Sequence, residues 1–185
     1  YTEVSRKDAV KETIYGGHLR YKRPTWSVGA TAVQVRYDRT LDRNLAPYNQ
    51  FEFEGQQNSN FGVDWNVLYR NLTWFGEGAR SANGGMAGIT GLLIALDKRL
   101  SFSMLYRDYQ RDYHALYSRA FAESTHPWNE RGFYTGIEMK PTREWMINAY
   151  CDQFRFPWLR YQTNAPSEGS DVFGQVKWTP NKKVE

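Results

Sequence analysis

Hydrophobic and polar residues alternate along most of this chain with a period of two. The clearest example places Thr135, Ile137 and Met139 at every second position, and the alternation resumes at Trp145 after the segment 140–144. A period of two is typical of β-strands, and a Pro-Thr pair between two such runs indicates a tight turn. The stretch therefore predicts a hairpin with one apolar face and one polar face.

The same alternation predicts about nine strands and no helix. The strands are expected near residues 14–22, 25–37, 51–69, 72–80, 86–96, 100–112, 132–140, 145–155 and 171–178. Short polar turns are expected at 22–25, 70–71, 97–99, 140–144 and 179–183. Longer connections are expected near 38–50, 80–85, 113–131 and 156–170. Short and long connections thus alternate along the whole chain.

This alternation of connection lengths favours one class of β-protein. Outer-membrane barrels have short periplasmic turns and long extracellular loops, whereas a soluble meander has no reason for the difference. The expected fold class is therefore all-β: a transmembrane, antiparallel, up-and-down β-barrel of the outer-membrane type. A periplasmic girdle of aromatic residues is expected from five tryptophans close to the short turns: Trp26, Trp65, Trp74, Trp145 and Trp178. The alternative is a soluble sheet whose strand ends collect aromatic residues.

The period of two also predicts which side chains share a face. The predicted lipid-facing residues are Val35, Val63, Phe102, Met104, Ile137, Ile147 and Val176. The predicted lumen-lining residues are Arg20, Arg36, Asp64, Glu77, Arg107, Arg111, Glu138, Lys140, Asp152 and Lys177. A soluble barrel would bury this second set, and each buried charge would need a partner. One segment, 84–96, is apolar or small on both faces, and its glycines suggest a bend or the close approach of another segment.

The amino-acid composition excludes several classes of protein. Mean hydropathy is −0.73, and no stretch approaches the roughly 18 apolar residues that a membrane helix needs. The net charge is +4, and the lysine and arginine residues are interleaved with aspartate and glutamate along the chain. No block of basic residues therefore indicates nucleic-acid binding. Cys151 is the single cysteine, which excludes an internal disulfide. We expect one barrel segment over residues 1–185, with 1–13 as a polar loop or lead-in. The odd strand number suggests part of a larger barrel.

Two loop segments resemble a known family. They contain Ser118-Arg119-Ala120-Phe121 with Trp128-Asn129, and Phe156-Pro157-Trp158-Leu159-Arg160-Tyr161. The region 60–185 is similar to the barrel portion of a family of Bacteroidota outer-membrane proteins that carry a periplasmic helix-hairpin-helix domain before the barrel. The resemblance implies an outer-membrane location in a Gram-negative cell and a barrel larger than nine strands. It implies no catalytic residue, and the helical hairpin motif is not in this sequence.

An outer-membrane protease is a remote alternative function. Asp112 and His114 are spaced like the Asp/His pair of omptin-type outer-membrane proteases, but no facing acidic pair accompanies them. A serine hydrolase would need a histidine beside Ser101 or Ser103, and calcium could bind rim acids such as Glu123. His18, His114 and His126 lie in separate segments. We expect no enzyme, no cofactor and no metal site.

Two functions follow from these expectations. The first is a non-enzymatic subunit of a multiprotein envelope assembly for export, barrel insertion or transport. Its expected partner contact is the loop with Phe156, Trp158, Leu159 and Tyr161. The second is a porin-like channel for small polar or anionic solutes, suggested by the mixed charges of the expected lumen. In both cases the partners include outer-membrane lipid and lipopolysaccharide, and no nucleic acid is expected.

Overall fold

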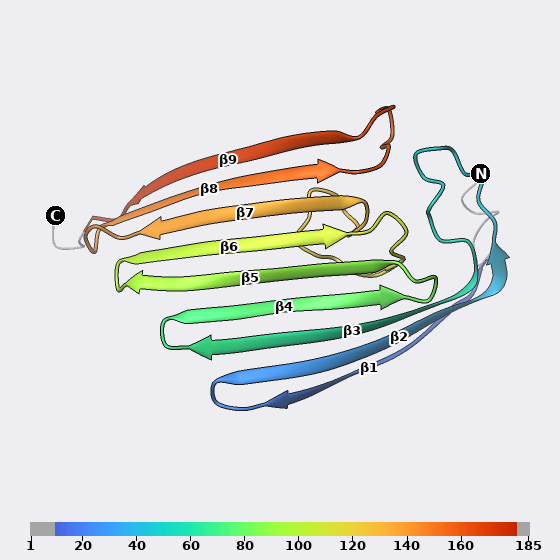
Figure 1. Ribbon diagram of the computed structural model, residues 1–185, viewed down its shortest axis with the longest axis horizontal. Coiled ribbons are helices and arrows are strands. Elements are labelled where there is room, and N and C mark those ends of the chain that lie inside the picture. The colour runs from blue at the N-terminus through green and yellow to red at the C-terminus, as the bar shows by residue number, and fades with distance from the viewer. Residues whose placement is uncertain (1–9, 181–185) are drawn as a thin grey trace.

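The protein is a single antiparallel sheet of nine strands (Figure 1). The computed structural model describes residues 10–180. The strands are β1 (Glu12–Lys22), β2 (Trp26–Leu41), β3 (Gly55–Tyr69), β4 (Leu72–Ser81), β5 (Met86–Asp97), β6 (Leu100–Tyr109), β7 (Glu130–Met139), β8 (Trp145–Phe156) and β9 (Ser167–Trp178). No helix among the described residues is long and apolar enough to cross a membrane. The predicted lead-in 1–13 lies mostly outside the described residues, and its last two residues belong to β1.

Each strand pairs with its neighbours in sequence, so the sheet is an up-and-down meander ordered β1 to β9. Hairpin register is continuous except for irregularities in β2 between Arg36 and Leu41 and in β5 between Ala95 and Asp97. The sheet does not close on itself, because β1 and β9 do not pair with each other. The predicted all-β, antiparallel, up-and-down arrangement is confirmed.

The connections define two ends of the sheet. One end, the turn end, carries the connections 23–25, 70–71, 98–99 and 140–144, and the other, the loop end, carries 42–54, 82–85, 110–129 and 157–166 (Figure 1). The alternation of short and long is not strict, because 82–85 is a tight turn in which Gly84 has a φ of 99°. At the turn end, the two-residue turn 70–71 places Arg70 at a φ of 55°, the left-handed conformation common in hairpins with two-residue loops.

Four strand boundaries differ from the prediction by three residues or more. β2 continues to Leu41 instead of ending at 37. β3 begins only at Gly55, whose φ of 118° ends the preceding loop. β6 ends at Tyr109 rather than at 112, because the Tyr113 amide donates to the Gln110 carbonyl and turns the chain. β9 begins earlier than predicted, since the polar stretch from Ser167 pairs with the end of β8. The polar side chains of this stretch show no alternation of apolar and polar residues, so the sequence does not predict the strand that backbone pairing forms.

The register divides the strand residues into two faces. One face, called the polar face, carries most of the charged side chains of the strands: Glu12, His18, Arg20, Lys22, Asp64, Glu77, Arg107, Glu130, Glu138, Asp152, Asp171 and Lys177. The opposite face, called the apolar face, carries Asp97 at the turn end, and its other register-placed charges lie at the loop end: Arg36, Arg80, Asp108, Arg131, Arg155 and Glu168. Between that charged rim and the turn end, the described apolar face has no charged side chain.

Burial is confined to one corner of the molecule. The most buried side chains are Val35, Phe53, Asn58, Ser81, Arg107, Tyr109, Tyr113, Glu130, Asp152 and Phe156. All lie on the polar face near the loop end or in the loops above it. The accessible surface is 13619 Å² for a chain of 21.7 kDa, against about 9,200 Å² expected for a compact protein of that mass. The sheet therefore has no core of the kind that supports a soluble two-layer domain.

Candidate functional site: the loop-covered polar face

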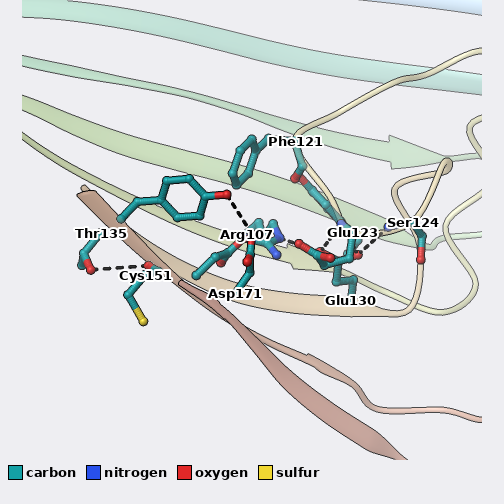
Figure 2. A network of polar contacts seen from close by, with 11 residues as sticks. Arg107, Phe121, Glu123, Ser124, Glu130, Thr135, Cys151 and Asp171 are labelled. Atoms are coloured by element: carbon teal, nitrogen blue, oxygen red, sulfur yellow. Dashed lines mark hydrogen bonds and ion pairs between the residues drawn. The ribbon is translucent and has the colours of Figure 1, made fainter. Parts of the chain in front are cut away.

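A buried ion cluster lies where the long connection 110–129 covers the polar face (Figure 2). The guanidinium of Arg107 on β6 donates from Nε to Glu130 Oε1 of β7 at 2.6 Å and from Nη1 to Asp152 Oδ1 of β8 at 2.9 Å. The Arg107 and Glu130 side chains are fully buried, and that of Asp152 is 5% exposed. Gly132, opposite Arg107 in the register, leaves the space that the guanidinium fills.

The cluster holds the connection 110–129 against the sheet. Besides binding Arg107, the Glu130 carboxylate accepts hydrogen bonds from the backbone amides of Glu123 and Ser124, at 3.1 and 3.3 Å. The Phe121 ring covers the Arg107 guanidinium at 5.2 Å, and the Tyr109 hydroxyl donates to the Phe121 carbonyl. One carboxylate thus serves both a buried cation and the loop backbone.

Charge at this site is unbalanced. Glu123 lies beside Glu130 and Asp152, and Asp171 of β9 accepts a hydrogen bond from the Tyr150 hydroxyl at 2.8 Å (Figure 2). Partial burial raises the pKa of Glu123, and the carboxylates of Asp152 and Glu130 raise it further, while Arg107 opposes them. The loop therefore packs against the sheet more readily when Glu123 is protonated.

A second contact fastens the beginning of the same connection. The His114 carbonyl accepts hydrogen bonds from the side-chain amides of Asn58 and Asn60 on β3, at 2.7 and 2.8 Å. The His114 amide donates to Ser81 Oγ, and its Nε2 lies 2.7 Å from the Phe51 carbonyl oxygen. His114, weighed above as a catalytic residue, thus makes structural contacts between two loops and the sheet.

The loops also bind one another. Arg111 packs over the rings of both Phe51 and Trp158, with its guanidinium carbon 4.4 and 4.7 Å from the two centroids, and the two rings meet edge-on. The Trp158 indole donates to the Pro47 carbonyl, and its backbone amide donates to the side chain of Asn129. Connections 42–54, 110–129 and 157–166 therefore form one packed cap over the loop end.

The turn end of the polar face has an open counterpart to the buried cluster. Asp64 of β3 accepts a hydrogen bond from Arg20 Nη2 at 2.6 Å and lies 2.9 Å from His18 Nε2. Gly29, between β1 and β3, leaves room for the Asp64 and His18 side chains. The side chains of Arg20 and His18 are 52% and 39% exposed. An arginine thus binds a carboxylate here as well, but no loop in the described part of the chain covers the pair.

Most predicted face assignments agree with the register, and two do not. Asp64, Glu77, Arg107, Glu138, Asp152, Lys177 and Arg20 share the polar face, and Val63, Phe102, Met104, Ile137, Ile147 and Val176 share the apolar face. Val35, however, pairs with Asn58 on the polar face, and Arg36 lies on the apolar face at its charged rim. The cap buries Val35 to 3% exposure, which explains an apolar residue on that side.

Two further predicted lumen residues lie outside the strands. Arg111 belongs to the cap, and Lys140 follows β7, where its ammonium group lies 2.6 Å from Glu138 Oε1. The five predicted girdle residues, Trp26, Trp65, Trp74, Trp145 and Trp178, all lie on the apolar face toward the turn end. A second aromatic row, absent from the prediction, lies next to the charged rim and consists of Tyr15, Phe61, Tyr106 and Phe133.

The predicted partner loop does not present a single exposed apolar surface. Phe156 is the last residue of β8 and is 2% exposed, and Trp158 is packed inside the cap. Tyr161 is 69% exposed and packs edge-on against Tyr48. The structure therefore assigns most of this apolar surface to the contacts between loops.

Glycines in the segment 84–96 mark close approaches, as expected. A side chain at Gly85 would collide with the backbone of Asp112, and one at Gly91 would lie 2.5 Å from the Phe75 ring.

The sequence does not predict the role of Glu130. The glycine opposite Arg107 is the one signal that a large side chain fills the space above it.

Metal binding finds no support in the described residues, where no group of three or more His, Cys, Asp or Glu side chains is arranged to hold an ion. Comparison with protein-family models gives no match, and comparison with curated protein sequences gives none either.

Proposed function

We propose that these nine strands form part of the wall of an outer-membrane β-barrel in a Gram-negative bacterium, with the apolar face toward lipid and the polar face toward the lumen. The observation that carries the proposal is the apolar face itself, which is free of charge between two aromatic rows. Outer-membrane barrels have an apolar band flanked by aromatic girdles, and this face matches that order.

Exposure supports the same proposal. Large apolar side chains of this face are open to solvent on the edge strands and in the middle of the sheet, among them Leu19 at 81%, Val172 at 73% and Phe61 at 56%. Water-soluble monomers rarely expose apolar patches beyond a few hundred Å². If this face contacts lipid, its apolar side chains are no longer exposed to water, and the free-energy cost of that exposure is removed for every strand.

Strand direction indicates how the wall would be completed. β1 and β9 both run from the loop end to the turn end, since each follows an even number of hairpin reversals. Backbone groups at an open edge cannot stay unpaired in lipid. An antiparallel closure between β9 and β1 therefore requires an odd number of additional strands, which gives an even total, as is usual in bacterial barrels.

We propose further that this wall is a non-enzymatic subunit of an envelope assembly. The cap supports this view because three connections bind one another and the polar face at the loop end, which would close the lumen toward the cell exterior. A free diffusion channel would keep this passage open. A porin-like channel is the second candidate, and the exposed His18, Arg20 and Asp64 side chains at the turn end favour it.

Purification of the native protein from outer membranes, followed by conductance measurements in planar bilayers, distinguishes the two. A subunit should co-purify with partners at fixed stoichiometry and conduct little by itself. The Glu130→Gln variant, which weakens the loop contact, should conduct more than the native protein. Steady conductance by the native protein without partners would replace the subunit proposal with the channel. Recovery only in the soluble fraction would contradict the membrane location.

A further inference from the structure

An open cavity of about 450 Å³ lies on the polar face beside the ion cluster, on the side toward the turn end. Two rows of side chains cross it from β6 to β9. The register places Ser101, Glu138, Asn148 and Gln175 side by side in one row, and Ser103, Gly136, Tyr150 and Phe173 in the next. We call it the Tyr150 cavity.

Tyr150 and Phe173 of the second row form a strip of aromatic rings with Tyr134 of the neighbouring row. Tyr134 and Tyr150 have centroids 5.3 Å apart, and Tyr150 stacks on Phe173 at the same distance with an interplanar angle of 21°. Phe173 is 42% exposed, and Leu93 across the cavity is 48% exposed. An apolar strip thus lies within a face that is otherwise polar.

The polar row around this strip has unused hydrogen-bonding capacity. The side chains of Ser101, Asn148 and Gln175 make no hydrogen bond to another residue in the part of the chain that the structure describes. Over Gly136, a Cβ atom would lie 2.6 Å from Ser103 Oγ and 2.7 Å from the Tyr134 hydroxyl, so these two groups converge on the space that the glycine leaves open.

The cavity has almost no net charge. Glu138 is its one charged lining residue, and it is paired with Lys140 at 2.6 Å. Amides and hydroxyls can each donate and accept hydrogen bonds. An anion would find no unpaired cation among the lining residues, and a cation would compete with Lys140 for Glu138. The site therefore suits a neutral ligand that has both hydroxyl groups and an apolar surface.

We infer that the Tyr150 cavity binds an uncharged oligosaccharide. The volume lies in the range of small-ligand sites, which combine apolar walls with a few placed polar groups. A sugar ring presents C–H groups that can pack along Tyr150 and Phe173, while its hydroxyls can pair with Asn148, Gln175 and the serines. The inference rests on the proposed lumen position of the polar face, which keeps the cavity wet and accessible from the turn end.

The test uses the native protein in a detergent without a sugar headgroup, such as lauryldimethylamine oxide. Saturation-transfer NMR titrations with maltohexaose, cellohexaose and chitohexaose should detect binding of at least one. Phe173→Ala and Asn148→Leu should each weaken that binding about tenfold, the effect of losing one good contact. Phe133→Ala, an aromatic truncation on the opposite face of β7, is the matched control and should leave binding unchanged.

Absence of binding for all three glycans would overturn the inference, as would equal losses in Phe133→Ala and Phe173→Ala. Tighter binding of hexagalacturonate than of every neutral glycan would also overturn it. None of these outcomes would affect the proposed membrane wall, because heat-modifiable gel mobility of the same sample reports the barrel separately from its ligand.

Discussion

The two ends of the polar face contain the same kind of ion cluster in opposite surroundings. At the loop end, Arg107 binds Glu130 and Asp152 with all three side chains buried or nearly so. At the turn end, Arg20 and His18 approach Asp64 in contact with solvent. Both clusters use a glycine on a neighbouring strand, Gly132 and Gly29, to make room. The difference is the cap, which removes water from one cluster and leaves the other wet.

This difference has an energetic consequence. Removing one partner of a buried ion pair leaves an uncompensated charge and is strongly destabilising, whereas exposed pairs contribute little. The buried cluster also joins the cap to the sheet, because Glu130 binds the backbone of the cap as well as Arg107. The loop end should therefore behave as a cooperative unit and the turn end as a set of independent side chains.

The largest effect is expected for Arg107→Ala. The change leaves Glu130 and Asp152 buried without their cation and should lower the free energy of unfolding by about 3–5 kcal/mol. Arg20→Ala, the matched change at the turn end, should cost about 0–1 kcal/mol because its partner remains solvated. Urea titrations followed by heat-modifiable gel mobility give both values. Similar losses for the two variants would contradict the contrast between the two ends.

The next effect concerns the other face of the sheet. Ile137→Arg places a charge on the apolar face between the aromatic rows and should cost about 2–4 kcal/mol in a lipid bilayer. Glu138→Arg, one residue away on the polar face, exchanges a half-exposed charge and should be tolerated much better. The yield of assembled barrel in vesicles measures both. Equal yields for the two variants would contradict the assignment of the apolar face to lipid and the polar face to water.

The smallest effect is expected from titration of Glu123. Its pKa is raised in the folded protein, so the folded cap binds this proton more tightly than the unfolded chain does. Protection of residues 110–129 from limited proteolysis should increase as pH falls from neutral toward the ordinary value of 4.5. Glu123→Gln should be protected at neutral pH and lose this dependence. The opposite slope in the native protein would mean that the ion pairs of Arg107 dominate the cap.

Sequence patterns predicted the strands well where a single rule decides the structure. The period of two located all nine strands and assigned Ile137, Phe102 and Val63 to one face, because each lies far from the loops. The pattern failed at Val35 and Arg36, since the cap buries the polar face there and the rim of the apolar face is charged. At this end, tertiary contacts rather than strand periodicity decide which residue type is tolerated.

The cap itself lay beyond sequence reasoning for a similar reason. Phe156, Trp158 and Tyr161 form an apolar cluster in the sequence, and this cluster predicts a partner surface. The contacts of Trp158 with Phe51 and Arg111, and of Tyr161 with Tyr48, join residues far apart in the chain. Glu130 follows a loop and is the first residue of its strand, so only the glycine opposite Arg107 hinted at a buried ion. Long-range contacts of this kind leave no local pattern.

The most direct test of the central claim is a spin-label scan along β7, from Phe133 to Met139, with the native protein reconstituted in lipid vesicles and Cys151→Ser as background. Collisions with oxygen, which partitions into lipid, should be frequent at Phe133, Thr135, Ile137 and Met139. Collisions with a water-soluble nickel chelate should be frequent at Tyr134, Gly136 and Glu138. Opposite periodicities of period two in the two reagents are the expected result. Accessibility of both sets to the nickel chelate alone would contradict a lipid-facing apolar face.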